Sequence, residues 1–180
     1  MKRSDLLVWM DLEMTSVQDV LKDKIIEIAI IVTDADLAIV AEGPDIVIHA
    51  SEEDFEGIPS EVKEMHDVSG IKKASIESDI SLKEAEAQVL AFLKQYIEPQ
   101  SSPLCGNSIH MDRHFLRIHM PAVDAYLHYR CIDVSILKEL GKRWSPSVGE
   151  FQKKKTHRAK DDIIESIEEL KFWRREILKQ

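Results

Sequence analysis

Three strand-forming segments follow one another at the start of the chain, and they limit the possible folds more than any other feature. Residues 6–13, 25–33 and 37–49 are rich in the apolar and branched residues that favour β-strands. Turn-forming stretches separate them, with Asp34-Ala-Asp between the second and the third. Three strands in direct succession predict that the sheet begins with antiparallel pairs.

The rest of the chain alternates between helix and strand patterns. Ser81 and Glu84 form a capping box, and apolar residues recur at helical spacing from Leu82 to Ile97, so a helix is expected to end before Pro99. Further on, the sequence predicts short strands at 103–107 and 129–133, and helices at about 111–120 (stopping at Pro121), 134–144 and 160–178. Leading strands followed by alternating helices and strands predict an α/β fold with a mixed sheet and helices packed on it.

Two segments have the composition of loops. Residues 51–75 carry glycine and proline among charged residues, with room for two short helices, and residues 145–156 are also loop-like. Loops over a rigid sheet commonly carry functional sites. No linker is long enough to divide the chain, so we expect a single domain over residues 1–180.

Composition and charge exclude several classes of protein. The 180 residues include 33 acidic and 24 basic side chains, a net charge of −9, which argues against wrapping long duplex DNA through a basic face. Cys105 and Cys131 are too few for a disulfide framework and lack the paired spacing of a zinc site. With no apolar run of 18 residues and no signal-peptide pattern, the sequence predicts a cytoplasmic protein without membrane attachment.

Asp11 and Glu13 are the most unusual residues of the first strand-forming segment. They alternate with apolar residues, so the two-residue period of a strand points both carboxylates to the same face. Two close carboxylates repel each other and lose hydration unless a cation lies between them. Mg²⁺ binds oxygen ligands, commonly a few carboxylates together with substrate phosphate. The pair therefore fits either a divalent-metal site or a solvated strand end.

Asp112 and Asp162 also lie at the ends of predicted elements. Asp112 follows Asn107 by five positions, in the first turn of a predicted helix, and Asp162 lies near the start of the last helix. Each one alone fits an acid that stabilises a helix N-terminus. With Asp11 and Glu13 they make four acids at element ends, and a fold that brings such ends together would need a metal ion to stabilise the cluster.

His157 stands five residues before Asp162. On one continuous helix, at about 100° per residue, the two side chains would point roughly 140° apart. A shared site therefore requires His157 in the loop before the helix or at the junction between them. A partly exposed histidine, with a pKa near 6.5, suits a general base that takes a proton from water, and it equally fits a plain surface histidine.

Three short motifs, and the segments between them, resemble one known family. The motifs are Asp11-x-Glu13, Asn107-x4-Asp112 and His157-x-Ala159-x-x-Asp162. They resemble the three exonuclease motifs of the DEDD superfamily, in the branch that carries a histidine. Within that branch the chain resembles the oligoribonucleases from about Leu6 to Ile177, and the segments Ile25-Ile-Glu-Ile and Tyr129-Arg-x-Ile-Asp-Val-Ser also agree.

The resemblance implies a fold, a reaction and a set of catalytic residues. The fold is ribonuclease H-like, with a five-stranded mixed sheet flanked by helices, and the protein is a homodimer. The reaction is 3′-to-5′ hydrolysis of very short RNA, with dinucleotides preferred, to nucleoside 5′-monophosphates. By this resemblance Asp11, Glu13, Asp112 and Asp162 would hold two Mg²⁺ or Mn²⁺ ions, and His157 would be the general base, which agrees with two-metal phosphodiester chemistry.

The resemblance also implies which residues bind the substrate. Ser108, Arg130 and Ser135 would contact its terminal phosphate, since Arg binds phosphate in a bidentate manner and hydroxyls near a helix N-terminus complete an anion site. His66 and Tyr129 would contact the bases or the chain end, with Tyr129 supplied by the partner subunit. Aromatic faces stack on bases without reading sequence.

Four positions depart from the pattern of this family. Ser16-Val17 stands where many members have Gly-Leu, so Val17 takes the place of a leucine that wedges between the two bases. Lys138 lies where a phosphate-contacting Thr is frequent, and Ser60 where Trp is common. These departures concern substrate affinity and length preference rather than hydrolysis.

Two other functions stay open on the sequence alone. One is a related 3′-to-5′ exonuclease acting on longer single strands of DNA or RNA, which rates against chain length would distinguish. The other is a nuclease-like fold that only binds nucleic acid or a protein, although all five catalytic positions are present. The run Lys153-Lys-Lys before the histidine motif fits either a surface that steers RNA or a solvated loop.

Overall fold

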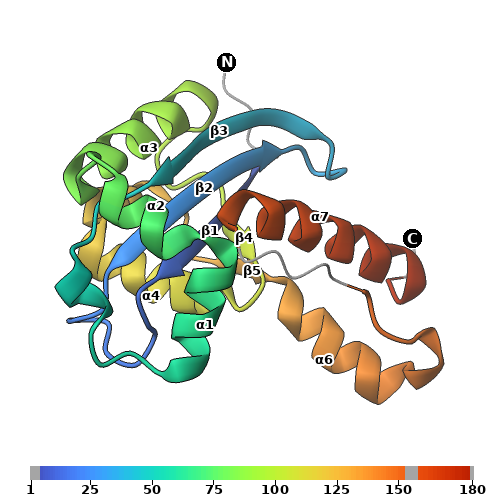
Figure 1. Cartoon of the computed structure of the whole chain (residues 1–180). Helices are drawn as coiled ribbons and strands as arrows, with labels where there is room; N and C mark the ends of the chain where they lie inside the picture. Colours follow the sequence, from blue (N-terminus) through green and yellow to red (C-terminus); the bar gives the residue numbers. More distant parts are fainter. Residues whose placement is uncertain (1–4, 153–157, 179–180) are drawn as a thin grey trace.

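Five strands form one mixed sheet in the order β3-β2-β1-β4-β5 (Figure 1). The computed structural model describes residues 5–152 and 158–178. The strands are β1 (Leu7–Met14), β2 (Ile25–Thr33), β3 (Ile39–Val47), β4 (Leu104–Gly106) and β5 (Cys131–Asp133). β1, β2 and β3 pair antiparallel, whereas β4 and β5 run parallel to β1 and to each other. The predicted mixed sheet with an antiparallel start is confirmed.

Seven α-helices surround this sheet in the described part of the chain. They are α1 (Ser60–Ser69), α2 (Ile71–Glu77), α3 (Leu82–Tyr96), α4 (Ile109–His119), α5 (Pro121–Tyr126), α6 (Val134–Trp144) and α7 (Ala159–Glu176). Two 3₁₀ turns, η1 (Glu52–Phe55) and η2 (Pro146–Val148), complete the elements. None of these helices is long and apolar enough to cross a membrane.

The helix boundaries follow local signals closely, with two differences. The capping box is confirmed, because the Ser81 hydroxyl accepts from the Glu84 backbone N–H and the Glu84 side chain accepts from the Ser81 backbone N–H. Pro121 does not only end α4; it is the first residue of α5, a position where proline's missing N–H costs nothing. The loop-like segment 51–75 contains two short helices, as allowed for, but α1 and α2 take up more of it than the composition indicated.

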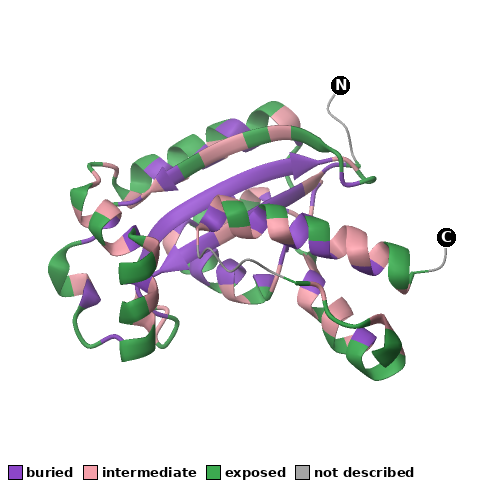
Figure 2. Ribbon diagram, turned by 45° about the vertical axis from the view of Figure 1, so that its right-hand side comes forward, coloured by how far each residue is buried: buried purple, intermediate pink, exposed green. Residues whose placement is uncertain are grey.

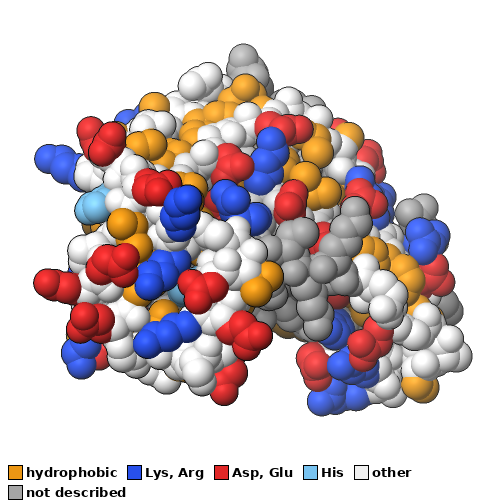
Figure 3. All heavy atoms as spheres, viewed as in Figure 1, with side chains coloured by type: hydrophobic (Ala, Val, Ile, Leu, Met, Phe, Trp, Pro, Cys, Tyr) orange, Lys and Arg blue, Asp and Glu red, His pale blue; other side chains and the backbone are white. Residues whose placement is uncertain are grey.

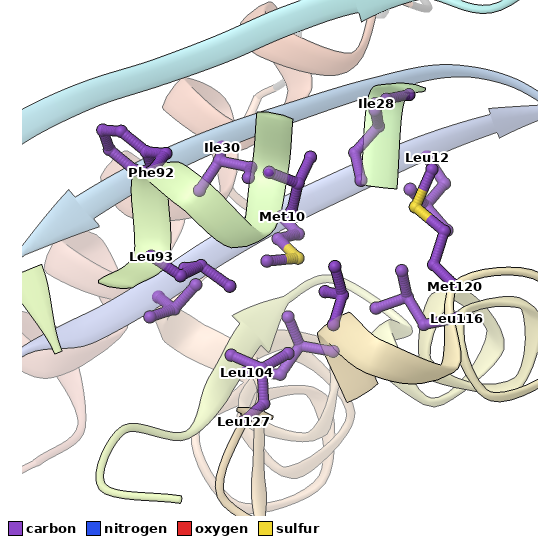
Figure 4. Packing of buried hydrophobic residues seen from close by; sticks show 14 of the residues in the cluster. Met10, Leu12, Ile28, Ile30, Phe92, Leu93, Leu104, Leu116, Met120 and Leu127 are labelled. Carbon is purple, nitrogen blue, oxygen red and sulfur yellow. The ribbon is translucent and has the colours of Figure 1, made fainter. Parts of the chain in front are cut away.

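The two faces of β1 pack against different helices. Met10 and Leu12 point into the larger hydrophobic core, together with apolar residues of α3 and α4 such as Leu93 and Leu116 (Figure 4). Trp9 belongs to a second buried cluster with apolar residues of α7. Helices therefore cover both faces of the central strands, which Figure 2 shows as buried along most of their length. Side chains alternate along a strand, so the odd-numbered positions of β1 face α7.

Candidate metal and nucleic-acid site

Three of the predicted acids meet between the end of β1 and the start of α7. Asp11 and Glu13 share the face of β1 that α7 covers, and Asp162 lies in the first turn of α7. One carboxylate oxygen from each of the three residues lies within 4.8 Å of the others. Glu13 is buried and the other two are half-buried. Three converging carboxylates of this kind are oxygen ligands suited to a hard divalent cation.

Asp112 lies on the other side of β1, in the first turn of α4. Its side chain is buried, and its Oδ1 accepts a hydrogen bond of 2.9 Å from the backbone N–H of Leu12. Asp112 is not a member of the three-carboxylate group found among the described residues. It is still close enough for its charge to raise the pKa of Asp11. The fourth predicted acid is therefore fixed beside the strand that carries the first two.

The electrostatics of this cluster disfavour full ionisation without a cation. Burial, followed by the charges of Asp112 and Glu13, holds the pKa of Asp11 well above its usual value. Burial, followed by the charges of Asp162 and Glu27, raises the pKa of Glu13 to about 8. Burial raises the pKa of Asp112 to about 7, although the Leu12 hydrogen bond opposes this shift. A divalent cation would relieve both causes, because it replaces lost hydration and neutralises like charges.

Glu27 and Arg158, for which the sequence predicted no role, form an ion pair beside these acids in which the carboxylate is buried and the guanidinium half-buried. Glu27 is completely buried on β2, directly opposite Glu13 in the strand register. Arg158 donates to its carboxylate from Nε at 2.9 Å and from Nη2 at 2.5 Å, and the backbone N–H of Ala159 donates at 3.0 Å. The sequence did offer one signal for Glu27: it is the single acidic residue of β2, whose other residues are apolar except Thr33.

The two predicted phosphate-binding serines meet where β4 and β5 lead into the helices that follow them. The backbone N–H of Ser108 donates to Asp133 Oδ1 at 3.0 Å and to the Ser135 hydroxyl at 2.9 Å. The Ser108 and Ser135 hydroxyl oxygens are 3.3 Å apart. Ser108 has a left-handed backbone with φ of +49°, a conformation that a side chain adopts only when its surroundings enforce it. The two hydroxyls therefore lie at the N-terminal ends of α4 and α6.

A chain of hydrogen bonds joins these serines to α7. Asn107 accepts from the Ser135 hydroxyl at 3.1 Å and donates from Nδ2 to the Ser166 hydroxyl at 2.8 Å. Ser166, one turn after Asp162, donates to the Asp162 backbone carbonyl at 2.8 Å. The serine pair and the acidic cluster are thus parts of one connected structure.

Arg130 and Tyr129 lie on the segment that leads into β5, and both are exposed. The Arg130 guanidinium lies over the Tyr129 ring, 5.3 Å from its centroid. Buried Arg113 holds this segment, since it donates to the His128 carbonyl at 2.8 Å and to Asp124 at 2.9 Å. The position of the two predicted substrate-binding residues therefore depends on an ion pair in α4 and α5.

The other predicted substrate-binding residues differ in exposure. Val17 is 57% exposed on the loop after β1, and Lys138 is half-buried on α6, one turn after Ser135. His66 is completely buried; its Nε2 is 3.1 Å from the Met14 carbonyl oxygen, so the ring contacts the end of β1 from below the surface.

His157 and the Lys153-Lys-Lys run lie outside the described residues. Arg158, the residue that follows the histidine in the chain, is described, and it belongs to the ion pair with Glu27.

Comparison with known proteins identifies the family. The exonuclease family model, RNase_T, matches residues 8–170. An oligoribonuclease of Pseudomonas aeruginosa is 52% identical over 174 residues, which cover 96% of each chain. A human protein named oligoribonuclease, mitochondrial, is 49% identical over 176 residues, or 97% of this chain and 74% of that protein.

The chain belongs to the oligoribonuclease family. It is thus an exoribonuclease, and the resemblance stated from its motifs is confirmed. Among solved structures, it resembles the zinc-bound complex of E. coli exonuclease I with single-stranded DNA, with a TM-score of 0.74 and 12% identity. The match covers 97% of this chain but 41% of the other, so the chain spans about two fifths of the exonuclease I length. This likeness confirms the ribonuclease H-like fold.

The metal-free exoribonuclease should lose stability as the pH rises through the raised pKa of Glu13. The pKa is about 8 in the folded protein against an ordinary 4.5, so the folded state binds more protons between these values. The contribution of Glu13 to the free energy of unfolding is therefore constant below about pH 4.5 and decreases from there towards pH 8. Thermal denaturation in chelator between pH 5 and 8 measures this slope.

Glu13→Gln is the matched variant for this measurement, because it removes the titrating group and keeps the shape of the side chain. Its melting temperature should depend less on pH than that of the parent. Mn²⁺ should stabilise the parent more at pH 8 than at pH 5, because metal ligands bind in their deprotonated form. Equal slopes for parent and variant in chelator would show that Glu13 does not carry the effect.

Proposed function

We propose that this exoribonuclease degrades very short RNA from the 3′ end, with dinucleotides as its preferred substrates, and releases nucleoside 5′-monophosphates. The observation that carries the proposal is the connection between two sites at the same edge of the sheet. The acidic cluster lies at the end of β1, and the paired serines lie just after β4 and β5, which run parallel to β1. A phosphate held at the serines would leave room for few nucleotides before the acids.

We propose that two Mg²⁺ or Mn²⁺ ions are held by Asp11, Glu13, Asp112 and Asp162. The buried, mutually repelling carboxylates support this ligand set. When bound, such ions supply a nucleophile at neutral pH and stabilise the charge of the phosphate in the transition state. The acids themselves do no proton transfer in this scheme. His157, next to Arg158 in the chain, is proposed as the general base that takes the proton from water.

We propose that Arg130, Ser108 and Ser135 bind the 5′-phosphate of the substrate. Arg130 is exposed and free to turn its guanidinium from the Tyr129 ring toward a phosphate, which it can bind through two parallel hydrogen bonds. Ser108 precedes the first turn of α4, where backbone N–H groups and the helix dipole favour an anion. Lys138, one turn after Ser135, would add positive charge.

We propose that the bases are held by apolar and aromatic side chains. Tyr129, at 70% exposure, offers a ring face for stacking, and Val17, at 57%, offers a short wedge on the loop after β1. His66 is proposed to contact the bases or the chain end of the substrate; because it is buried against Met14, this contact would require a local rearrangement.

We propose that the active form is a homodimer in the cytoplasm. Ile136 and Trp144 on α6, together with Tyr129, are large apolar residues that are 57–74% exposed, as expected of a surface that a second copy covers. In such a dimer Tyr129 would reach the site of the partner subunit. Both cysteines are free thiols, which fits a reducing compartment.

Turnover should fall steeply with substrate length. The test uses 5′-phosphorylated RNA of two, three, five and ten nucleotides with Mn²⁺. We expect the two-nucleotide RNA to be cleaved fastest, because only in that RNA can the 5′-phosphate bind the serines while the scissile phosphodiester lies at the acids. Chelator and Asp112→Ala should each abolish cleavage. Equal rates at all lengths would assign the chain to the exonucleases that act on longer single strands, and absence of cleavage would favour a binding protein.

Arg130→Ala should lower kcat/KM for the 5′-phosphorylated dinucleotide by roughly 10- to 100-fold, the value of a charge-assisted hydrogen bond. The rate on the ten-nucleotide RNA should change little. Arg143→Ala is the control, because Arg143 is an exposed arginine further along α6 that pairs with Glu139. Equal losses on both substrate lengths would contradict a role in end recognition.

His157→Ala should lower kcat by about 10²- to 10⁴-fold, the usual contribution of a general base, and should leave Mn²⁺ binding intact. Single-turnover rates and calorimetry of Mn²⁺ binding measure the two effects separately. His114→Ala, an exposed histidine on α4, serves as the control. Full activity of His157→Ala would exclude the assignment.

A further inference from the structure

Glu27 uses both oxygens of its buried carboxylate to hold the start of α7. Oε1 accepts from Nε and Nη2 of Arg158, and Oε2 accepts from Nε of Arg158 and from the backbone N–H of Ala159. The Glu27 side chain is 1% exposed and that of Arg158 is 40% exposed. The pair joins residues 131 positions apart in the chain, so it fixes a long-range contact rather than a local turn.

This contact provides the N-terminal cap of α7. The first backbone N–H groups of a helix lack partners within the helix, and the N-cap residue Arg158 makes no side-chain cap of its own. Glu27, which projects from β2, supplies that partner at Ala159, where a negative charge also interacts favourably with the helix dipole. The start of α7 is therefore set by the sheet.

The position of Asp162 depends on the same contact between Glu27 and the start of α7. Its backbone N–H donates to the Arg158 carbonyl at 3.0 Å, which is the first hydrogen bond of the helix. Glu27 lies opposite Glu13 in the register of β1 and β2, so the residue that holds the start of α7 is the direct cross-strand neighbour of one of the proposed metal ligands. A shift of Arg158 would be transmitted to Asp162 over one helical turn.

We propose that Glu27 and Arg158 are positioning residues: their ion pair holds the first turn of α7 so that Asp162 meets Asp11 and Glu13. The inference rests on the proposed metal site and extends it to two residues that are not themselves ligands. Arg158 has a second effect, because it neutralises Glu27, which would otherwise add a buried negative charge to the acidic cluster. The pair would thus control metal affinity through geometry and charge.

The competing explanation is that the pair only stabilises the fold. Replacing a buried ion pair by neutral side chains of similar size is often neutral or even stabilising, whereas removing one partner is strongly destabilising. The double variant Glu27→Gln/Arg158→Met therefore separates the two explanations, because it removes both charges and the bidentate contact while it keeps side chains that fill the same space.

The experiment compares the full-length parent and the double variant by calorimetry of Mn²⁺ binding, by melting temperature, and by kinetics on thymidine 5′-(4-nitrophenyl phosphate). We expect Mn²⁺ affinity to fall at least tenfold and kcat to fall by a similar factor, with KM nearly unchanged and a melting temperature close to that of the parent. Parent-like Mn²⁺ affinity and kcat would overturn the proposal.

Two further variants keep the test decisive. Arg158→Lys preserves the positive charge but not the bidentate contact with Glu27, so its Mn²⁺ affinity should lie between those of the parent and the double variant. If the double variant does not fold, parent-like Mn²⁺ affinity in Arg158→Lys overturns the proposal. Glu42→Gln is the control, because Glu42 forms an ion pair of 2.7 Å with Lys160 in the same turn of α7 but is exposed. It should bind Mn²⁺ as the parent does.

The outcome also distinguishes this proposal from the proposed function. A parent protein that binds no Mn²⁺ would refute the metal site itself. A parent that binds Mn²⁺ and cleaves the small ester without a preference for dinucleotides would refute the substrate assignment alone. Only the difference between parent and variants tests the role of Glu27 and Arg158.

Discussion

Mutual repulsion of buried carboxylates is the constraint around which this structure is arranged. Asp11, Glu13 and Asp162 converge within a few ångströms, and Asp112 lies close on the other side of β1. In a poorly solvated environment such a group is unfavourable in its ionised form, so a flexible chain would let the carboxylates separate. Here Asp11 and Glu13 are carried by a strand that pairs on both sides, and Asp112 and Asp162 by helices packed against it. The rigidity of the core maintains an arrangement that a divalent cation would stabilise.

The net negative charge of the protein limits the ways in which it can bind an anionic substrate. The chain has a net charge of −9, and Figure 3 shows acidic and basic side chains intermixed over one face rather than gathered into a basic surface. This distribution agrees with the proposal that a few placed groups, such as Arg130 and the N-terminal ends of α4 and α6, recognise an anionic substrate. Specific placement of this kind suits a short substrate better than a long one, which would gain from an extended basic groove.

Local signals in the sequence predicted most of the elements, and the exceptions have physical reasons. Strand-forming runs, the capping box at Ser81 and the bounds of α6 depend on neighbouring residues, so they were readable. The ion pair of Glu27 with Arg158 and the contacts of Arg113 were not, because their partners are distant in the chain and only the folded sheet brings them together. The burial of His66 was missed because the sequence allowed a short helix in this segment but gave neither its bounds nor the side that it buries.

No local pattern decided the role of any one of the four acids; the sequence predicted them as a set only because all four lie at element ends and match the family motifs, and their geometry depends on how α7 is docked. Two of its polar connections lie on either side of Asp162: Glu27 contacts the first residue of α7, and Asn107 contacts Ser166 one turn beyond Asp162. The first comes from β2 and the second from the loop that also orders Ser108 and Ser135. Asp162 therefore lies between two contacts of α7: the one that Ala159 makes with Glu27 of the sheet, and the one that Ser166 makes with Asn107 beside the serine pair. A phosphate that moved the serines would act on the same hydrogen-bonded chain that positions Asp162, so under the proposed function end recognition and metal binding would have a physical route by which each can affect the other.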